Sequence, residues 1–111
     1  KEKSLKEFLE KIGLKEENAN DVIENCYDII IFLIRSKLYV DGYAASGYNA
    51  HEAEISYLSK LNFLEEDIRF MNELRYFRNG ILYYGKSSNK EYAKKVVDFL
   101  KKMLPKLKKL I

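Results

Sequence analysis

Apolar positions recur at helical spacing through most of the chain, most clearly in residues 65–84. The stripe in this segment consists of Phe70, Leu74, Phe77, Ile81 and Tyr84. Alternating steps of four and three residues keep a stripe on one side of an α-helix, so the spacing predicts a helix from about 65 to about 84. The Asn-Gly pair at 79–80 is a hairpin signal in other contexts. Strand alternation fails here because Phe70 and Asn72 would share a face.

Gly80 is an unusual residue for the interior of this predicted helix. It costs a helix about 1 kcal/mol relative to alanine. Two interpretations fit: a small residue that lets another helix approach closely, or a tolerated kink.

Two helices are predicted in the N-terminal part of the chain, up to about residue 41. Ser4 and Glu7 have the spacing of a capping box for a short helix, which Gly13 would end. A long helix follows from about 16 to about 41. Its helically spaced apolar residues are Ala19, Val22, Ile23, Cys26, Ile30, Leu33, Ile34 and Leu38.

Residues 41–49 contain two glycines and are predicted to form a loop. Asn49 and Glu52 then have capping-box spacing for another helix. Its predicted buried side is Ala53, Tyr57, Leu58 and Leu61.

The last helix has a similar signature at its start, in Ser88 and Glu91. Its apolar face is Tyr92, Val96, Phe99, Met103, Leu107 and Leu110. Pro105 lacks an amide donor and is predicted to kink or break this helix near its end. Together these patterns predict one all-α domain, residues 1–111, built as a four- to five-helix up-and-down bundle.

Composition bears on the compartment of the protein, on membrane insertion and on its source. The single cysteine excludes an internal disulfide and indicates a reducing, cytoplasmic compartment. The longest apolar run has six residues, at 29–34, so no transmembrane span is predicted. Abundant Lys and Glu without any Gln indicate a thermophilic source.

Charge is distributed unevenly along the chain. Residues 86–111 hold nine lysines against two acidic residues, whereas the rest of the chain is net acidic. A basic segment of this kind can meet phosphates. The lysines lie opposite the apolar face, however, as in any solvated amphipathic helix, and no aromatic residues lie among them to stack bases.

Two arginines and two amides border the apolar stripe of the 65–84 helix: Asn72, Arg75, Arg78 and Asn79. Arginine presents a planar fork of donors that suits phosphate. The alternative is that the arginines pair with acids of the long helix, such as Asp28 or Glu24. The only histidine, His51, falls in the first turn of its helix. One histidine and one cysteine cannot build a zinc site unaided, and no cofactor is predicted.

The stretches "YNAHEAEISYL" and "RYFRN…YYGK" resemble the HEPN superfamily of small helical proteins, in a form common among archaea. The resemblance extends from about Val22 to Leu107 and includes the order of the helices. The family signature is an arginine, usually followed by a polar residue, with a histidine four to six positions after the arginine. Arg78 and Asn79 match its start, whereas Tyr83 occupies the position expected for histidine.

The resemblance implies a homodimer with a metal-independent ribonuclease site in its cleft. With Tyr83 in place of histidine, which titrates near neutral pH, either the site is degenerate, or Tyr83 acts differently, or His51 enters the cleft from another helix. Many prokaryotic members pair with a nucleotidyltransferase antitoxin, which in some pairs attaches AMP to a tyrosine near the motif. Tyr83 and Tyr84 are the candidate acceptors here.

Three functions are therefore expected as alternatives. The first is a homodimer that binds RNA or a nucleotide through Arg75, Arg78, Asn79 and Tyr84, with cleavage weak or lost. The second is an active metal-independent endoribonuclease toxin using Arg78, Asn79 and Tyr83 or His51. The third is a non-catalytic protein-interaction module whose arginines form structural salt bridges.

Overall fold

The computed structural model describes residues 2–44, 47, 50–84 and 90–111, and within these ranges all long regular elements are helices. They are α1 (Glu2–Lys11), α2 (Ala19–Val40), α3 (Ala50–Lys60), α4 (Glu65–Tyr84) and α5 (Lys90–Leu110), with a short 3-10 helix, η1 (Glu16–Asn18), before α2. The prediction of an all-α bundle is confirmed. None of the described helices has the length and apolarity needed to cross a membrane.

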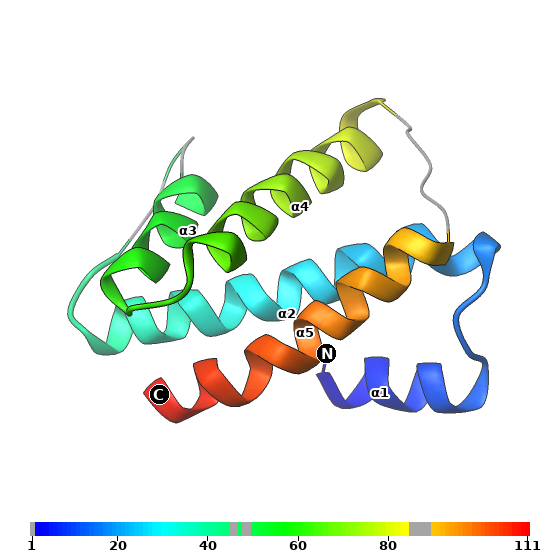
Figure 1. Cartoon of the computed structure of the whole chain (residues 1–111), viewed down its shortest axis with the longest axis horizontal. Coiled ribbons are helices and arrows are strands. Elements are labelled where there is room, and N and C mark those ends of the chain that lie inside the picture. The colour runs from blue at the N-terminus through cyan, green and yellow to red at the C-terminus, as the bar shows by residue number, and fades with distance from the viewer. Residues whose placement is uncertain (1, 45–46, 48–49, 85–89) are drawn as a thin grey trace.

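Helix α2 is the central element of the bundle and packs against α1, α3, α4 and α5 (Figure 1). In that view α2 and α5 run in the same direction, from right to left, and α4 runs back in the opposite direction. Because α2 has neighbours on several sides, ten of its 22 residues are buried. This arrangement explains why the apolar run at 29–34 occurs in a helix without a purely polar face.

The core is assembled around α2 from side chains of every α-helix. Its largest fully buried apolar members are Tyr27, Ile23, Ile30, Ile34, Ile55, Leu58, Met71, Leu74, Met103 and Leu107. Cys26 lies in the same core as a free thiol, and its burial raises the pKa of the thiol to about 12. The core therefore excludes water around the middle of α2.

Some helix starts differ from the predicted ones, and so do their capping residues. Helix α1 already includes Ser4, because it begins at Glu2, so the predicted capping box with Glu7 is wrong. Gly13 does follow the end of α1 with a φ of +85°, a conformation that glycine adopts without strain. The predicted start of the long helix, at about 16, is a 3-10 turn rather than α-helix. The capping residues predicted at Asn49 and Ser88 lie outside the described residues.

Helix α4 is continuous from Glu65 to Tyr84, so the Asn-Gly pair lies within a helix as the periodicity predicted. Its buried face is rotated relative to the predicted stripe, since Met71 and Leu74 are fully buried while Phe70 and Phe77 are only partly buried. The two phenylalanines pack against α5, with 4.4 Å between the ring centroids of Phe70 and Phe99. Gly80 is buried within the chain.

Helix α3 presents a different face to the core from the one predicted. Ala53 is exposed, and Tyr57 is only partly buried. The buried residues are Glu54, Ile55 and Leu58. Of these three residues the prediction included only Leu58.

Pro105 does not break α5, which continues to Leu110. The carbonyl that loses its helical donor belongs to residue 101, four positions earlier, where the helix is exposed. Water can satisfy that carbonyl, so the helix tolerates the proline on its solvent side.

Candidate functional site

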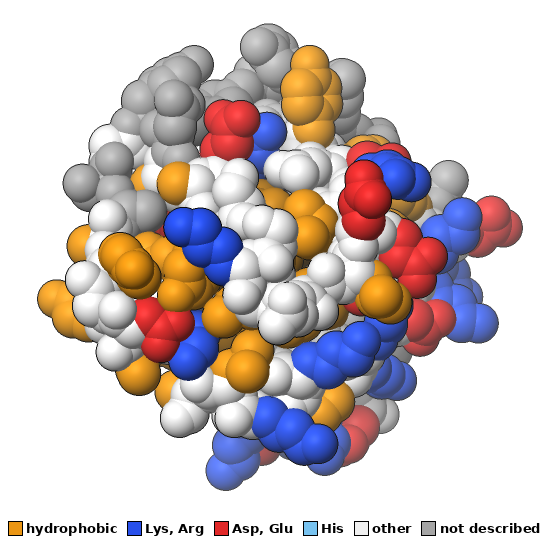
Figure 2. Space-filling model, turned by 60° about the vertical axis from the view of Figure 1, so that its left-hand side comes forward, with side chains coloured by type: hydrophobic (Ala, Val, Ile, Leu, Met, Phe, Trp, Pro, Cys, Tyr) orange, Lys and Arg blue, Asp and Glu red, His pale blue; other side chains and the backbone are white. Residues whose placement is uncertain are grey.

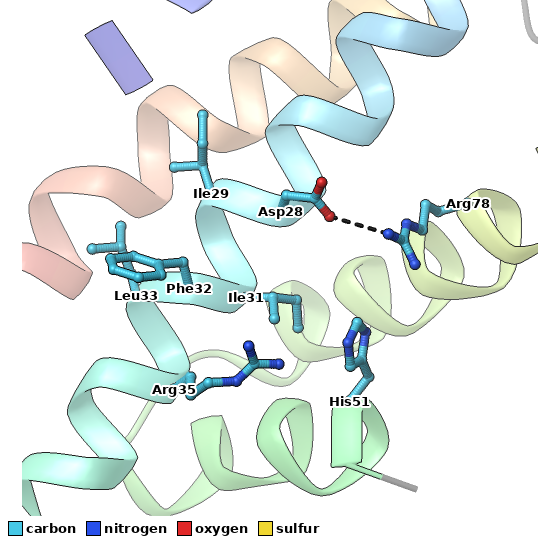
Figure 3. A pocket seen from close by; sticks show the side chains of 8 residues that line it. All are labelled: Asp28, Ile29, Ile31, Phe32, Leu33, Arg35, His51 and Arg78. Carbon is cyan, nitrogen blue, oxygen red and sulfur yellow. Dashed lines mark hydrogen bonds and ion pairs between the residues drawn. The ribbon is translucent and has the colours of Figure 1, made fainter. Parts of the chain in front are cut away.

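A hollow of about 590 Å³ opens between α2, α3 and α4 (Figure 3). Its lining comes from α2 except for His51 of α3 and Arg78 of α4. The lining residues are Asp28, Ile29, Ile31, Phe32, Leu33, Arg35, His51 and Arg78. The volume lies in the range of small-ligand sites, and an apolar lining with a few charged groups is typical of them. The hollow thus has the size and composition to accept a ligand with one charged part and one apolar part.

Arg78 is held at the hollow by two contacts with α2. Its Nη2 atom lies 3.3 Å from Oδ1 of Asp28, and its Cζ atom lies 5.4 Å from the centroid of the Tyr27 ring. An arginine over an aromatic face is stabilised by the ring quadrupole. The predicted alternative of an ion pair with Asp28 is confirmed for Arg78. Because only part of the guanidinium engages Asp28, the other donors remain outside this pair.

His51 is linked to the same tyrosine. The Tyr27 hydroxyl oxygen lies 2.9 Å from His51 Nδ1, and the two ring centroids are 5.7 Å apart. Burial raises the pKa of Tyr27 above its ordinary value, so the phenol keeps its proton. With Tyr27 as the donor, Nδ1 accepts and the hydrogen of the neutral imidazole is on Nε2.

The charge of His51 is set mainly by burial, which lowers the pKa of the imidazole. Glu54 opposes this effect, Arg78 and Arg35 reinforce it, and Asp28 opposes it. The net direction is downward from 6.5, so His51 is neutral at neutral pH. A neutral imidazole with its hydrogen on Nε2 is a hydrogen-bond donor rather than a proton acceptor at that atom.

Arg35 is a member of the site that the sequence analysis missed. Its Nε and Nη2 atoms lie 2.6 and 3.1 Å from the two carboxylate oxygens of Glu54. Glu54 is fully buried, whereas 49% of the Arg35 side chain is exposed. This bidentate pair fixes the plane of the guanidinium at the edge of the hollow. The available signal was the acidic residue at 54, next to Ile55 and one turn before Leu58 on an apolar face.

The structure brings together two of the residues predicted from the sequence, Arg78 and His51. Arg75 and Asn79 are partly buried on α4 but do not line the hollow. The Nε atoms of Arg75 and Arg78 are buried and have no hydrogen-bond partner among the described residues. The side chains of Tyr83 and Tyr84 lie outside the described part of the chain, and with them the predicted AMP acceptors and the position of the motif histidine.

The basic surface predicted for the C-terminal segment is partly neutralised. Lys102 of α5 lies 2.5 Å from Oδ1 of Asp67, a buried residue at the start of α4, and Lys106 lies 3.9 Å from Oδ2. Figure 2 shows basic side chains interspersed with acidic and neutral ones on the face that it draws. On that face, as far as its residues are described, the basic side chains do not form a continuous surface.

Within the ranges that the structure describes, no three or more His, Cys, Asp or Glu side chains come together in a way that could hold a metal ion. Comparisons with protein-family models, with curated proteins and with solved structures found no match. Fold and site therefore define a small helical-bundle protein with an arginine- and histidine-lined hollow.

Proposed function

We propose that this protein is a HEPN-like domain that binds RNA or a nucleotide by its phosphate, at the hollow between α2, α3 and α4. The observation that carries the proposal is the convergence of Arg35, His51 and Arg78, from three different helices, on one hollow. Guanidinium groups match the geometry of phosphate oxygens, and the neutral His51 adds a donor. Asp28 pairs with Arg78 and helps to keep the arginine in place.

The same geometry favours binding over cleavage. A ribonuclease of this kind needs a group that takes a proton from the 2′-hydroxyl. His51 has Nδ1 engaged by Tyr27, and its Nε2 atom carries the hydrogen in that arrangement. Tyr27 has a raised pKa, so less of the phenolate that could accept this proton is present at neutral pH than for an ordinary tyrosine. Weak or lost cleavage is therefore part of the proposal.

The resemblance extends the proposal to partners and compartment. A HEPN-like protein would form a homodimer in the cytoplasm and pair with a nucleotidyltransferase in a toxin–antitoxin or defence system, with Tyr83 or Tyr84 as the AMP acceptor. Light scattering at high protein concentration tests the dimer. Intact-mass measurement after incubation with the nucleotidyltransferase and ATP tests the modification, and Tyr83→Phe and Tyr84→Phe variants locate it.

Calorimetric titration with adenosine 5′-monophosphate at low salt tests the binding function. The native chain is expected to bind, and Arg78→Ala is expected to lose at least about tenfold in affinity, since a charge-assisted contact contributes roughly 1.5–3 kcal/mol. Arg69→Ala is the matched control, because Arg69 is on the same helix, is mostly exposed and forms an exposed pair with Glu65 at 3.8 Å. No binding by the native chain, or equal losses in both variants, would overturn the proposal.

An active endoribonuclease is the second candidate, and one observation favours it. Arg78, His51 and the Asp28 carboxylate line the same hollow, so a cation, an imidazole and a potential proton acceptor are close together. An RNA-cleavage assay with EDTA distinguishes the two candidates. Cleavage by the native chain that is lost in both Arg78→Ala and His51→Ala would establish the enzyme. Equal, background-level cleavage in all three proteins supports the binding function.

A further inference from the structure

One wall of the hollow is a stripe of α2 formed by Asp28, Phe32 and Arg35. Steps of four and three residues put the three side chains on the same face of the helix. Phe32 lies in the middle of this stripe and lines the hollow, yet 66% of its side chain is exposed. An exposed phenyl ring at the edge of a hollow is a surface on which the flat ring of a ligand can stack.

Arg35, three residues after Phe32 on α2, is oriented by Glu54. The pair uses Nε and Nη2 of the guanidinium, so the Nη1 donors lie outside it. Glu54 is fully buried and cannot follow a moving arginine, which fixes where Arg35 presents these donors. The α2 wall therefore contributes both a flat apolar surface, Phe32, and an oriented cation, Arg35, to the lining of the hollow.

The opposite wall supplies polar groups and no phenyl or phenol ring that is exposed to the hollow. His51 and Arg78 are its members, and Figure 3 shows them across the hollow from Arg35 and Phe32. The Tyr27 ring cannot serve as a stacking surface because it is fully buried beneath Arg78. Phe32 is thus the aromatic side chain that the described lining makes accessible to a ligand.

We propose that Phe32 is a base-stacking residue, so that the ligand is a nucleoside phosphate or an unpaired nucleotide of single-stranded RNA. The base lies on the Phe32 ring, and Arg35 and Arg78 hold the phosphate. This inference rests on the proposed function and adds recognition of the base to that of the phosphate. Bases in a duplex have both faces covered by their neighbours, so duplex RNA is excluded from this mode.

Calorimetric titrations with two probes test the inference: adenosine 5′-monophosphate and ribose 5-phosphate, which carries the phosphate but no base. The native chain should bind the adenosine nucleotide more tightly. Phe32→Ala should weaken that binding by roughly 5- to 150-fold, the range measured for base–aromatic stacking. The same variant should leave the affinity for ribose 5-phosphate unchanged. Phe32 is exposed, so its substitution does not disturb the core.

Two controls separate stacking from other effects. Tyr39→Ala removes another exposed aromatic residue, 74% accessible and seven positions further along α2, which does not line the hollow. It should change neither affinity. Phe32→Tyr should retain the native affinity, whereas Phe32→Leu should lose most of it because leucine has no aromatic face.

The outcomes distinguish the two proposals. Equal affinities for both probes, or native affinity in Phe32→Leu, would overturn the stacking role while phosphate binding stands. Failure of both probes to bind would overturn the proposed function and the stacking role together. Tighter binding of a single-stranded adenine oligonucleotide than of its duplex supports the inference, and the reverse order contradicts it.

Discussion

Tyr27 and His51 are joined by a hydrogen bond of 2.9 Å that ties α2 to α3 at the floor of the hollow. The tyrosine is fully buried, and its ring also supports Arg78 of α4. Tyr27 of the central helix thus contacts candidate site residues of two other helices, His51 of α3 and Arg78 of α4. The relative positions of His51 and Arg78 depend on this tyrosine more than on any direct contact between them.

Tyr27→Phe should destabilise the protein by about 1 kcal/mol, because the ring remains and only the hydroxyl contact with His51 is lost. Urea unfolding at neutral pH measures the difference. Tyr39→Phe is the control, since Tyr39 is exposed and its hydroxyl should be worth less than about 0.5 kcal/mol. Equal effects in the two variants would show that the Tyr27 hydroxyl contributes nothing specific.

The protonation of His51 should make stability depend on pH. Burial holds the pKa of His51 below 6.5 in the folded chain, whereas the unfolded chain has the ordinary value. Between the two values the unfolded chain binds the proton and the folded chain does not, so stability rises with pH there. The contribution is fully present above pH 6.5 and is lost as the pH falls toward the folded-state pKa.

Unfolding measurements at about pH 7.5 and about pH 5 test this dependence. His51→Gln, which cannot be protonated, should lose less stability over this interval than the native chain. The charged groups around His51 are Asp28, Arg35, Glu54 and Arg78, and all four are retained in the variant. Parallel curves for the two proteins would mean that His51 titrates alike in the folded and unfolded states.

The Arg35–Glu54 pair should respond very differently to single and double substitution. Arg35→Met leaves the buried Glu54 carboxylate without its two donors and should cost about 3–5 kcal/mol. Arg35→Met combined with Glu54→Leu removes both charges and should recover most of that loss. Thermal unfolding of the native chain and the two variants provides the comparison. A double variant no more stable than the single one would indicate that the pair itself stabilises the fold.

A second buried carboxylate, that of Asp67 at the start of α4, is also paired with a cation, Lys102 of α5. Lys102 donates to the buried carboxylate, and this contact raises the pKa of Lys102. Lys102→Met should destabilise the chain by roughly 1–3 kcal/mol, because Lys106 at 3.9 Å is a poor replacement. Lys101→Met, on an exposed neighbouring position of α5, should change stability by less than about 0.5 kcal/mol. Similar denaturant midpoints for the two variants would contradict a specific role for the ion pair.

The helices themselves were predictable because their apolar periodicity is long and uninterrupted. In α4 the pattern outweighed the local Asn-Gly signal, since twenty residues of consistent spacing exceed one dipeptide. Boundaries were harder to predict. Ser4 had the sequence of a cap, but a helix that begins at Glu2 had already included it. Local capping signals cannot show where packing against α2 extends a helix.

Only some of the residues at the hollow could be predicted from the sequence. Arg78 and His51 were identified because their residue types are chemically distinctive, and the pairing of Arg78 with Asp28 was among the alternatives considered. Glu54 and Arg35 were missed because each looks like an ordinary surface charge when taken alone. The burial of Glu54 depends on its pairing with Arg35, across 19 residues of sequence, and a helical pattern contains no information about such a pair.

The reactivity of Cys26 can be used to measure how often the core of this protein opens. The thiol is the only one in the chain, lies at the middle of the central helix and is fully buried. Its raised pKa of about 12 leaves almost no thiolate at neutral pH, so an alkylating reagent can react only with molecules whose bundle has come apart around α2. The labelling rate of the native chain therefore reports how often the core is exposed, and a ligand in the neighbouring hollow would slow it in proportion to its occupancy.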